Sequence, residues 1–140
     1  MDRALIEAYR TTNYVVFDRR GEVTIRIGER NAATDQLLAR FGARSAVFIT
    51  AWNPHSRNLT QGRNEYRQRC LLTYLRLRGV PILLGEGRGT GAYWPPESSV
   101  LALRISQLEA ARMGRAWGQN AVVFLSFGAP AQLLLLRFCW

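Results

Sequence analysis

Eight polar side chains in the second two-thirds of the chain could form a binding or catalytic site. Hydroxyl and amide groups recognise a ligand through directional hydrogen bonds. Glu97 is the candidate catalytic residue, a general acid or base, because it follows two prolines and precedes a buried strand, where the loss of water would raise its pKa. Two structural roles remain open for it: accepting loop N–H groups and pairing with Arg88. The expected ligand-binding residues are Thr50, Asn53, Ser56, Asn64, Ser98, Gln119 and Asn120.

The composition argues against several other kinds of chemistry. All 19 cationic residues are arginine, so there is no lysine for a Schiff base or for a phosphate-binding loop. One histidine, two distant cysteines and three scattered aspartates do not make the ligand clusters of zinc or magnesium sites. No metal site is therefore predicted, and the sequence leaves the cofactor open.

Two short motifs could be mistaken for catalytic ones. His55 and Ser56 are adjacent, but no aspartate is placed to orient the imidazole as a serine hydrolase requires. Gly87, Gly89 and Ala92 fit the pattern G-x-G-x-x-A after a strand, yet the Tyr-Trp-Pro-Pro segment that follows cannot begin a helix. We therefore expect neither a serine hydrolase nor a dinucleotide-binding site.

The hydrophobic pattern predicts an α+β fold in which residues 1–140 form a single domain. Alternating apolar residues at Val23, Ile25 and Ile27 indicate a half-exposed strand, which forms an N-terminal antiparallel hairpin with the strand before it. About three main helices should cover a mixed β-sheet. The expected strands are 13–18, 22–27, 45–50, 80–84, 98–105, 119–126 and 132–138, and the expected helices are a short one at 2–9 and longer ones at 32–41, 63–78 and 107–117.

The order of these elements predicts that the polar residues meet. Strands 45–50 and 80–84 flank the long helix 63–78, and such strand-helix-strand units are normally parallel. The loops after the two strands would then leave from one edge of the sheet, the edge where open α/β sheets bind ligands. The glycine-rich segment 85–96 has no helix signal, so strand 98–105 should return antiparallel and begin at that same edge.

The antiparallel return of strand 98–105 also predicts where the remaining polar residues lie. Residues 97–98 stand at the start of the returning strand, and helix 107–117 would bring residues 119–120 back to the same edge. Asn64 lies in the first turn of the long helix, where unpaired N–H groups and the helix dipole favour an anion. Each residue alone is also an ordinary turn or capping residue, so the functional interpretation depends on their convergence.

Four segments carry short motifs: residues 9–14 (Tyr-Arg-Thr-Thr-Asn-Tyr), 50–56 (Thr-Ala-Trp-Asn-Pro-His-Ser) with Asn64, 94–98 (Trp-Pro-Pro-Glu-Ser) and 117–121 (Trp-Gly-Gln-Asn-Ala). In order and spacing these motifs resemble a bacterial family of uncharacterised proteins, domain of unknown function 3293, over about residues 9–125. The family's function is unassigned, so the resemblance implies no activity. Relatives often carry an acidic residue in the glycine-rich loop, and residues 89–93 of this chain have none, so no metal site is implied there.

The function expected from these observations is the binding, or the enzymatic conversion, of a small anionic ligand that resembles a nucleotide or carries phosphate. The formal charge of +9 leaves a nucleic-acid-binding module as one alternative. A protein-interaction domain, in which the polar motifs only brace loops, is the other. The longest apolar run is too short to cross a membrane and the first ten residues lack the core of a secretory signal, so we expect a cytoplasmic protein with no membrane partner. The oligomeric state stays open.

Overall fold

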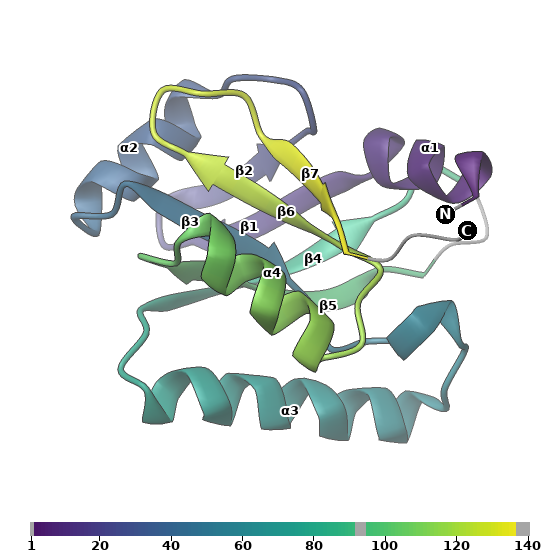
Figure 1. Cartoon of the computed structure of the whole chain (residues 1–140). Coiled ribbons are helices and arrows are strands. Elements are labelled where there is room, and N and C mark those ends of the chain that lie inside the picture. The colour runs from purple at the N-terminus through teal and green to yellow at the C-terminus, as the bar shows by residue number, and fades with distance from the viewer. Residues whose placement is uncertain (1, 92–94, 137–140) are drawn as a thin grey trace.

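The computed structural model describes residues 2–91 and 95–136, and Figure 1 shows α1 and α2 at opposite ends of its sheet. The helices are α1 (Arg3–Thr11), α2 (Ala32–Arg40), α3 (Gln61–Leu77) and α4 (Gln107–Ala116), and a short 3-10 helix, η1, covers Pro54–Ser56. The strands are β1 (Asn13–Asp18), β2 (Gly21–Ile25), β3 (Ser45–Ile49), β4 (Ile82–Arg88), β5 (Glu97–Leu103), β6 (Ala121–Ser126) and β7 (Gln132–Leu135). The expected α+β class is confirmed.

Local capping residues explain where the helices begin. Asp2, Asn31 and Thr60 each precede a helix, and the side chain of each accepts a hydrogen bond from a backbone N–H of the first turn. Ser106 and Glu109 form a reciprocal capping box at the start of α4. These contacts satisfy N–H groups that a helix cannot pair internally.

The strands form one sheet of seven in the order β2-β1-β4-β5-β3-β6-β7. Each neighbouring pair is antiparallel, including the expected N-terminal hairpin of β1 and β2. The parallel part of the expected mixed sheet is reduced, within the described residues, to an isolated bridge between Ile27 and Ala131. This bridge joins the chain next to the two edge strands, β2 and β7, so the sheet curls towards a barrel.

Strands β3 and β4 are not neighbours in the sheet. The two strands run in the same direction, as expected, because each is antiparallel to β5, but β5 lies between them. Residues 100–103 of β5 are fully buried, which suits a central strand covered on both faces. Strand β4 contains two glycines and the exposed Leu84, which suit it less well for that place. The edge reached by the loops is unchanged, because β3 and β4 still finish where β5 and β6 begin.

Strand β4 continues to Arg88, into the segment predicted as a loop. A Cβ atom on Gly85 would collide with the carbonyl oxygen of Val15 and crowd the ring of Phe48. Gly87 pairs with Tyr14 of β1 on one side and with the first residue of β5 on the other. Gly85 therefore allows a close approach between strands, and both glycines belong to a paired strand rather than to a loop.

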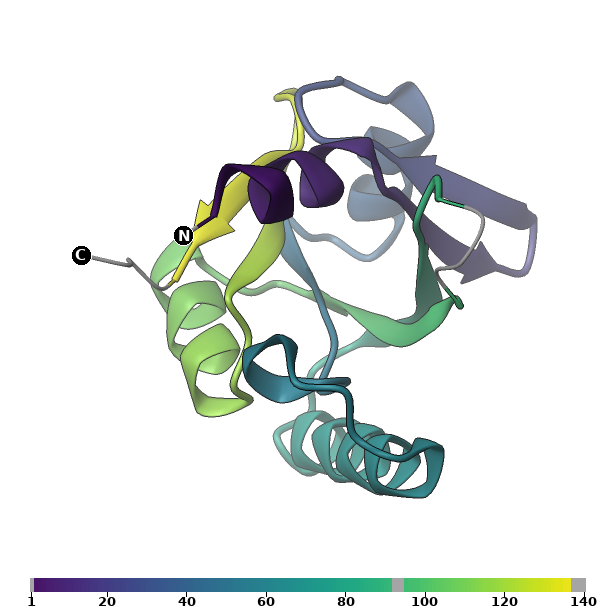
Figure 2. The same cartoon turned by 90° about the vertical axis from the view of Figure 1, so that its right-hand side faces the viewer.

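Apolar side chains fill both faces of the curled sheet. On the outer face, α3 and α4 pack through Leu71, Leu75 and Met113. On the inner face, Leu37 and Leu38 of α2 fill the end of the curl that carries the isolated bridge. Figure 2 looks at the other end, where the strands curve around and α1 passes across them. The core therefore closes one end of the sheet and leaves the α1 end for a site.

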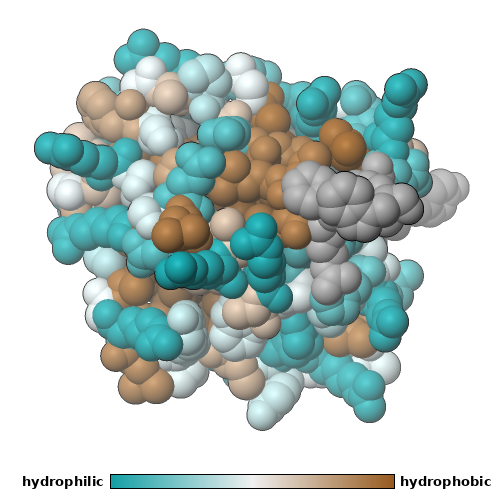
Figure 3. All heavy atoms as spheres, in the orientation of Figure 1, coloured by the Kyte–Doolittle hydropathy of each residue, from teal (hydrophilic) through white to brown (hydrophobic). Residues whose placement is uncertain are grey.

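Figure 3 gives the surface in the orientation of Figure 1, with apolar side chains gathered where β6 and β7 lie and hydrophilic ones around them. Among the helices of the described residues, none is long and apolar enough to cross a membrane. Three residues of the predicted loop, 92–94, and the end of the last predicted strand, 137–138, lie outside the described part of the chain.

Candidate functional site

Polar side chains from several segments meet around a cavity at the α1 end of the sheet. The cavity has a volume of about 310 Å³. Six of the eight residues predicted from the sequence line it: Thr50, Asn53, Ser56, Glu97, Gln119 and Asn120. They share one cavity because β3 finishes, and β5 and β6 begin, at this end of the sheet.

The inner wall of the cavity is apolar and aromatic. Tyr14 and Phe48 line it with their rings edge to face and the ring centroids 5.4 Å apart. Val123 and Leu133 add aliphatic surface from β6 and β7, and Trp52 adds a third aromatic side chain. An apolar wall with a few polar groups is the usual composition of a small-molecule site.

Helix α1 covers the cavity with one face. Leu5, Ala8 and Tyr9 of α1 and its C-cap Thr12 follow the i, i+3, i+4, i+7 spacing of one helix face, and all four line the cavity. The Tyr14 hydroxyl donates a 2.6 Å hydrogen bond to the carbonyl oxygen of Tyr9, which fastens the last turn of the helix to the sheet. No residue of α1 is fully buried. The helix therefore covers the cavity without becoming part of the core.

The segment between β3 and α3 presents Asn53 and Ser56 to the cavity through an uncommon backbone conformation. Asn53, His55 and Ser56 have positive φ angles of 45°, 57° and 58°. Asn64 fixes this turn, because its Oδ1 accepts the Asn53 N–H and its Nδ2 donates to Asn53 Oδ1, both at 2.8 Å. Asn53 Oδ1 also accepts the N–H of Leu59 at 3.0 Å. The strained turn persists because several bonds determine it together.

Two of the predicted residues, Asn64 and Ser98, are not among the residues that line the cavity. Asn64 is only 2% exposed and lies behind the turn, so its contacts make it a positioning residue rather than a binding one. Ser98 follows Glu97 in β5, and successive side chains of a strand point to opposite faces of the sheet. Its carbonyl oxygen accepts a 2.6 Å hydrogen bond from Thr50 Oγ1. The first turn of α3, expected to hold an anion, does not line the cavity either.

Thr50 and Gln119 line the cavity but also brace its backbone. Thr50 Oγ1, besides its bond to β5, accepts the N–H of Trp52 at 3.0 Å. Gln119 Nε2 donates to the carbonyl oxygens of Trp52 and Trp117, at 3.3 and 3.2 Å. These bonds connect the β3–α3 turn to the segment that follows α4, so the two side chains hold the rim together.

Tyr9, Ser56 and Asn120 form a hydrogen-bonded group at the rim. Asn120 Nδ2 donates to Ser56 Oγ at 2.7 Å, and the Tyr9 hydroxyl bonds both side chains. Burial, and then the charge of Glu97, raise the pKa of Tyr9, while its two hydrogen bonds offset part of that effect. The Tyr9 hydroxyl therefore stays protonated at neutral pH and can donate a hydrogen bond.

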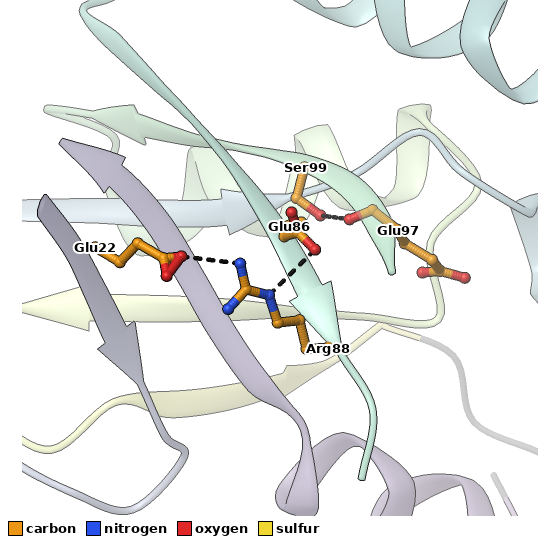
Figure 4. A network of polar contacts seen from close by, with 5 residues as sticks. All are labelled: Glu22, Glu86, Arg88, Glu97 and Ser99. Atoms are coloured by element: carbon orange, nitrogen blue, oxygen red, sulfur yellow. Dashed lines mark hydrogen bonds and ion pairs between the residues drawn. The ribbon is translucent and has the colours of Figure 1, made fainter. Parts of the chain in front are cut away.

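Glu97, the first residue of β5, faces the cavity. In Figure 4 its carboxylate points away from Arg88, whose guanidinium pairs with Glu22 at 2.9 Å and with Glu86 at 3.2 Å. The alternative in which Glu97 pairs with Arg88 is therefore wrong. Glu97 Oε1 instead accepts a 3.4 Å hydrogen bond from Asn53 Nδ2. Burial raises the pKa of Glu97, and the bond from Asn53 offsets part of that effect.

The cavity combines one carboxyl group with hydroxyls, amides and aromatic rings. Glu97 is the acidic residue of the described lining, which contains no arginine. Within residues 2–91 and 95–136, no cluster of three histidine, cysteine, aspartate or glutamate side chains could hold a metal ion. The arrangement can therefore accept a proton or a hydrogen bond at Glu97, donate one from Tyr9, and contact an apolar group on its inner wall.

Sequence reasoning missed the contribution of the N-terminal helix and first strand to the cavity. Tyr9, Thr12 and Tyr14 line it because β1, antiparallel to β4, begins where β4 ends. The order of elements fixed the directions only of the strands from residue 45 onwards, so the position of β1 relative to them stayed open. The signal was nevertheless present, because residues 9–14 carry one of the family-like motifs.

Comparisons with known proteins point to one family. The family model described as "Protein of unknown function (DUF3293)" matches residues 49–122, more than half of the chain. The matched segment contains all eight predicted site residues, from Thr50 to Asn120, and leaves out α1 and β1. No curated protein and no solved structure matches the chain. The chain therefore belongs to the DUF3293 family of proteins of unknown function.

Proposed function

We propose that this protein binds a small organic molecule in the cavity at the α1 end of its sheet. The observation that carries the proposal is the cavity itself, with its aromatic and aliphatic wall beneath a rim of hydroxyl, amide and carboxyl groups. Sites of this composition and of roughly 300 Å³ or more hold small ligands and orient them with a few polar contacts. Polar residues that only braced loops would not need an open volume beside them.

The charge of the lining favours a neutral or cationic ligand over the anion expected from the sequence. An ionised Glu97 would repel an anion, and the described lining has no arginine to offset that repulsion. The N-terminus of α3, which could hold an anion, lies outside the described lining. The polar rim would then recognise the ligand through hydrogen bonds, and a negative charge on the ligand would not add to binding.

An enzymatic reaction in this cavity would use Glu97 as its general acid or base. Burial brings the pKa of this carboxyl closer to neutral pH, which improves proton transfer under working conditions. The Tyr9 hydroxyl is the second group that could donate a proton, because it stays protonated beside Ser56 and Asn120. Binding alone does not require either step, so ligand binding is tested first.

A thermal-shift screen tests the proposal with neutral, cationic and anionic fragments, nucleotides and phosphorylated metabolites among them. A ligand present at 100 times its dissociation constant should stabilise the wild-type protein by about 2.7 kcal/mol. Gly87→Leu should abolish that stabilisation, because its side chain would enter the cavity from a position where a Cβ has its nearest neighbour at 3.8 Å. Gly62→Leu is the control, because a Cβ there meets nothing within 4 Å. If no fragment stabilises the protein, or if Gly87→Leu keeps the effect, the proposal is wrong.

Nucleic-acid binding is a second candidate function, favoured by the distribution of charge. Helices α3 and α4, with the residue that ends α3, expose the arginines 63, 69, 76, 78, 112 and 115 against two exposed glutamates, 65 and 109. The ion pairs between described residues lie elsewhere, on the hairpin, α2 and β4. Unpaired arginines on neighbouring helices give the electrostatic contribution on which phosphate-backbone binding depends.

A further inference from the structure

The Glu97 carboxylate faces the cavity without a cation to balance it among the described residues. The ion pairs given above involve other acids, and Arg88 of the neighbouring strand β4 is held by Glu22 and Glu86 (Figure 4). The side-chain donor to Glu97 is the neutral amide of Asn53, at 3.4 Å. A half-buried carboxylate in this position is incompletely compensated, and a ligand that supplied a positive charge would stabilise it.

The walls beside Glu97 also suit an organic cation. Tyr14, Phe48 and Trp52 line the same cavity, and the faces of aromatic rings attract ammonium groups. Tyr14 and Phe48 are packed edge to face, so this wall is fixed by the core before any ligand arrives. An ammonium group could then bind Glu97 while an aromatic or aliphatic body rests on the inner wall.

We infer that the cavity selects an organic primary amine, bound as its ammonium ion, with the Glu97 carboxylate as the counter-ion. This inference rests on the proposed small-molecule site and names its ligand class. Glu97 then acts as a specificity-determining residue, and the Tyr9–Ser56–Asn120 group bonds polar substituents of the ligand. The same geometry disfavours a carboxylate or a phosphate of similar size, because either would meet Glu97 with like charge.

Three probes of nearly equal shape test the inference by calorimetric titration at neutral pH: 2-phenylethylammonium, the neutral 2-phenylethanol and the anion phenylacetate. The wild-type protein should bind the ammonium at least about tenfold more tightly than the alcohol, and the acid most weakly. Glu97→Gln should reduce ammonium affinity to about that of the alcohol. Glu86→Gln is the matched control, because Glu86 pairs with Ser98 in the register and is not part of the cavity lining.

Failure of this inference can be distinguished from failure of the proposed site. Equal binding of ammonium and alcohol, tighter binding of the acid, or an unchanged ammonium preference in Glu97→Gln would overturn the amine inference and leave the cavity as a binding site. A loss of ammonium preference in Glu86→Gln as large as that in Glu97→Gln would also overturn it. Absence of binding by all three probes would overturn the amine inference. The fragment screen would then decide whether the cavity binds another class of molecule.

Discussion

Asn53 and Asn64 hold the shape of the site, whereas Glu97 faces the cavity where a ligand would bind. The two asparagines exchange side-chain and backbone hydrogen bonds at 2.8 Å, which fixes a turn with positive φ at Asn53. Asn53 Nδ2 then reaches the carboxylate of Glu97. The buried Asn64, which is 2% exposed, therefore helps to position the carboxylate of Glu97 through Asn53.

Replacing Asn64 by alanine should destabilise the protein and disorder the turn that carries Asn53. The change leaves the Asn53 N–H without its buried acceptor, which should cost about 1 to 3 kcal/mol. Glu65→Ala, one residue further along α3 on its exposed side, should change stability by no more than about 0.5 kcal/mol. Denaturant unfolding of the two variants measures the difference. Equal stabilities would contradict the positioning role of Asn64.

Replacing Glu97 by glutamine should change how stability depends on pH. Because burial raises the pKa of Glu97 above its ordinary value of 4.5, the folded protein binds more protons than the unfolded chain in the interval above that value. The contribution of this carboxyl to wild-type stability is therefore fully present below 4.5 and is lost as the pH rises through the folded-state pKa. The pKa values of neighbouring Tyr9 and Tyr14 are raised, so neither titrates in this range.

Unfolding free energies of wild-type and Glu97→Gln proteins, measured from about pH 4 to about pH 8, test this prediction. As the pH rises, the unfolding free energy of the wild-type protein should decrease relative to that of Glu97→Gln. Asp18 should behave in the opposite way in both proteins, because its hydrogen bond with Arg40 lowers its pKa and its contribution is lost as the pH falls. A difference in unfolding free energy that did not change with pH would show that the Glu97 carboxyl is not partly desolvated in the folded protein.

At the residue scale, the sequence predicted which residue types gather but not which way each one faces. Glu97 and Ser98 are neighbours in the predicted site, the first as general acid or base and the second as a binding residue, and the alternation of strand β5 places only Glu97 at the cavity. A strand that began one residue later would exchange the two. Hydrophobic periodicity cannot decide which of the two faces the cavity, because both are polar and both precede the apolar run of the strand.

At the scale of elements, alanine substitutions of two helical glycines should have opposite effects on stability. Gly62→Ala should stabilise α3 by about 0.5 to 1 kcal/mol, since a Cβ there meets nothing within 4 Å. Gly114→Ala should destabilise by about 1 to 3 kcal/mol, because a Cβ there would collide with the side chains of Leu136 and Val122. Urea unfolding of both variants measures the effects. A Gly114→Ala protein as stable as Gly62→Ala would contradict the packing of α4 on β6 and the segment after β7.

Element types and directions were predictable, whereas the order of strands in the sheet was not. Alternating and continuous apolar runs marked each strand, and the predicted antiparallel return of β5 is confirmed. The insertion of β5 between β3 and β4 depends on which strand can be buried on both faces, a property of the assembled core. Glycines 85 and 87 indicated a loop because their pairing with β1 and β5 is long-range and leaves no local signal in the sequence.

At the scale of the whole molecule, the exposed arginines of α3 and α4 lie on a different face from the cavity. The exposed arginines of α3 and α4 cover the outer face of the sheet, and the cavity opens at its α1 end. Because the described cavity lining contains no arginine, the formal charge of +9 does not by itself indicate an anionic cavity ligand. Any nucleic-acid binding and the proposed small-molecule binding are expected to be independent of each other.

The second candidate function predicts salt-sensitive oligonucleotide binding on the α3–α4 face. Fluorescence anisotropy with random duplex and single-stranded oligonucleotides at about 50 and 200 mM salt should give a log-log slope near −0.9 per phosphate neutralised on duplex DNA. Arg69→Ala and Arg76→Ala should each reduce the size of that slope by about one. Arg19→Ala and Arg20→Ala, on the hairpin turn, should do little. Weak binding, or equal effects of all four substitutions, would remove this function from consideration.

The most direct test of the small-molecule site is an amide NMR titration of the isotope-labelled protein with 2-phenylethylammonium and, separately, with 2-phenylethanol. Binding in the cavity predicts shift changes that saturate at one equivalent and cluster in residues 9–14, 52–56, 87–91, 97–99 and 119–123, which contribute to its lining. Gly87→Leu should abolish these changes, and Gly62→Leu should preserve them. An absence of shift changes with both compounds would contradict the amine inference, and changes that centre on α3 and α4 and survive Gly87→Leu would contradict the cavity as the binding site.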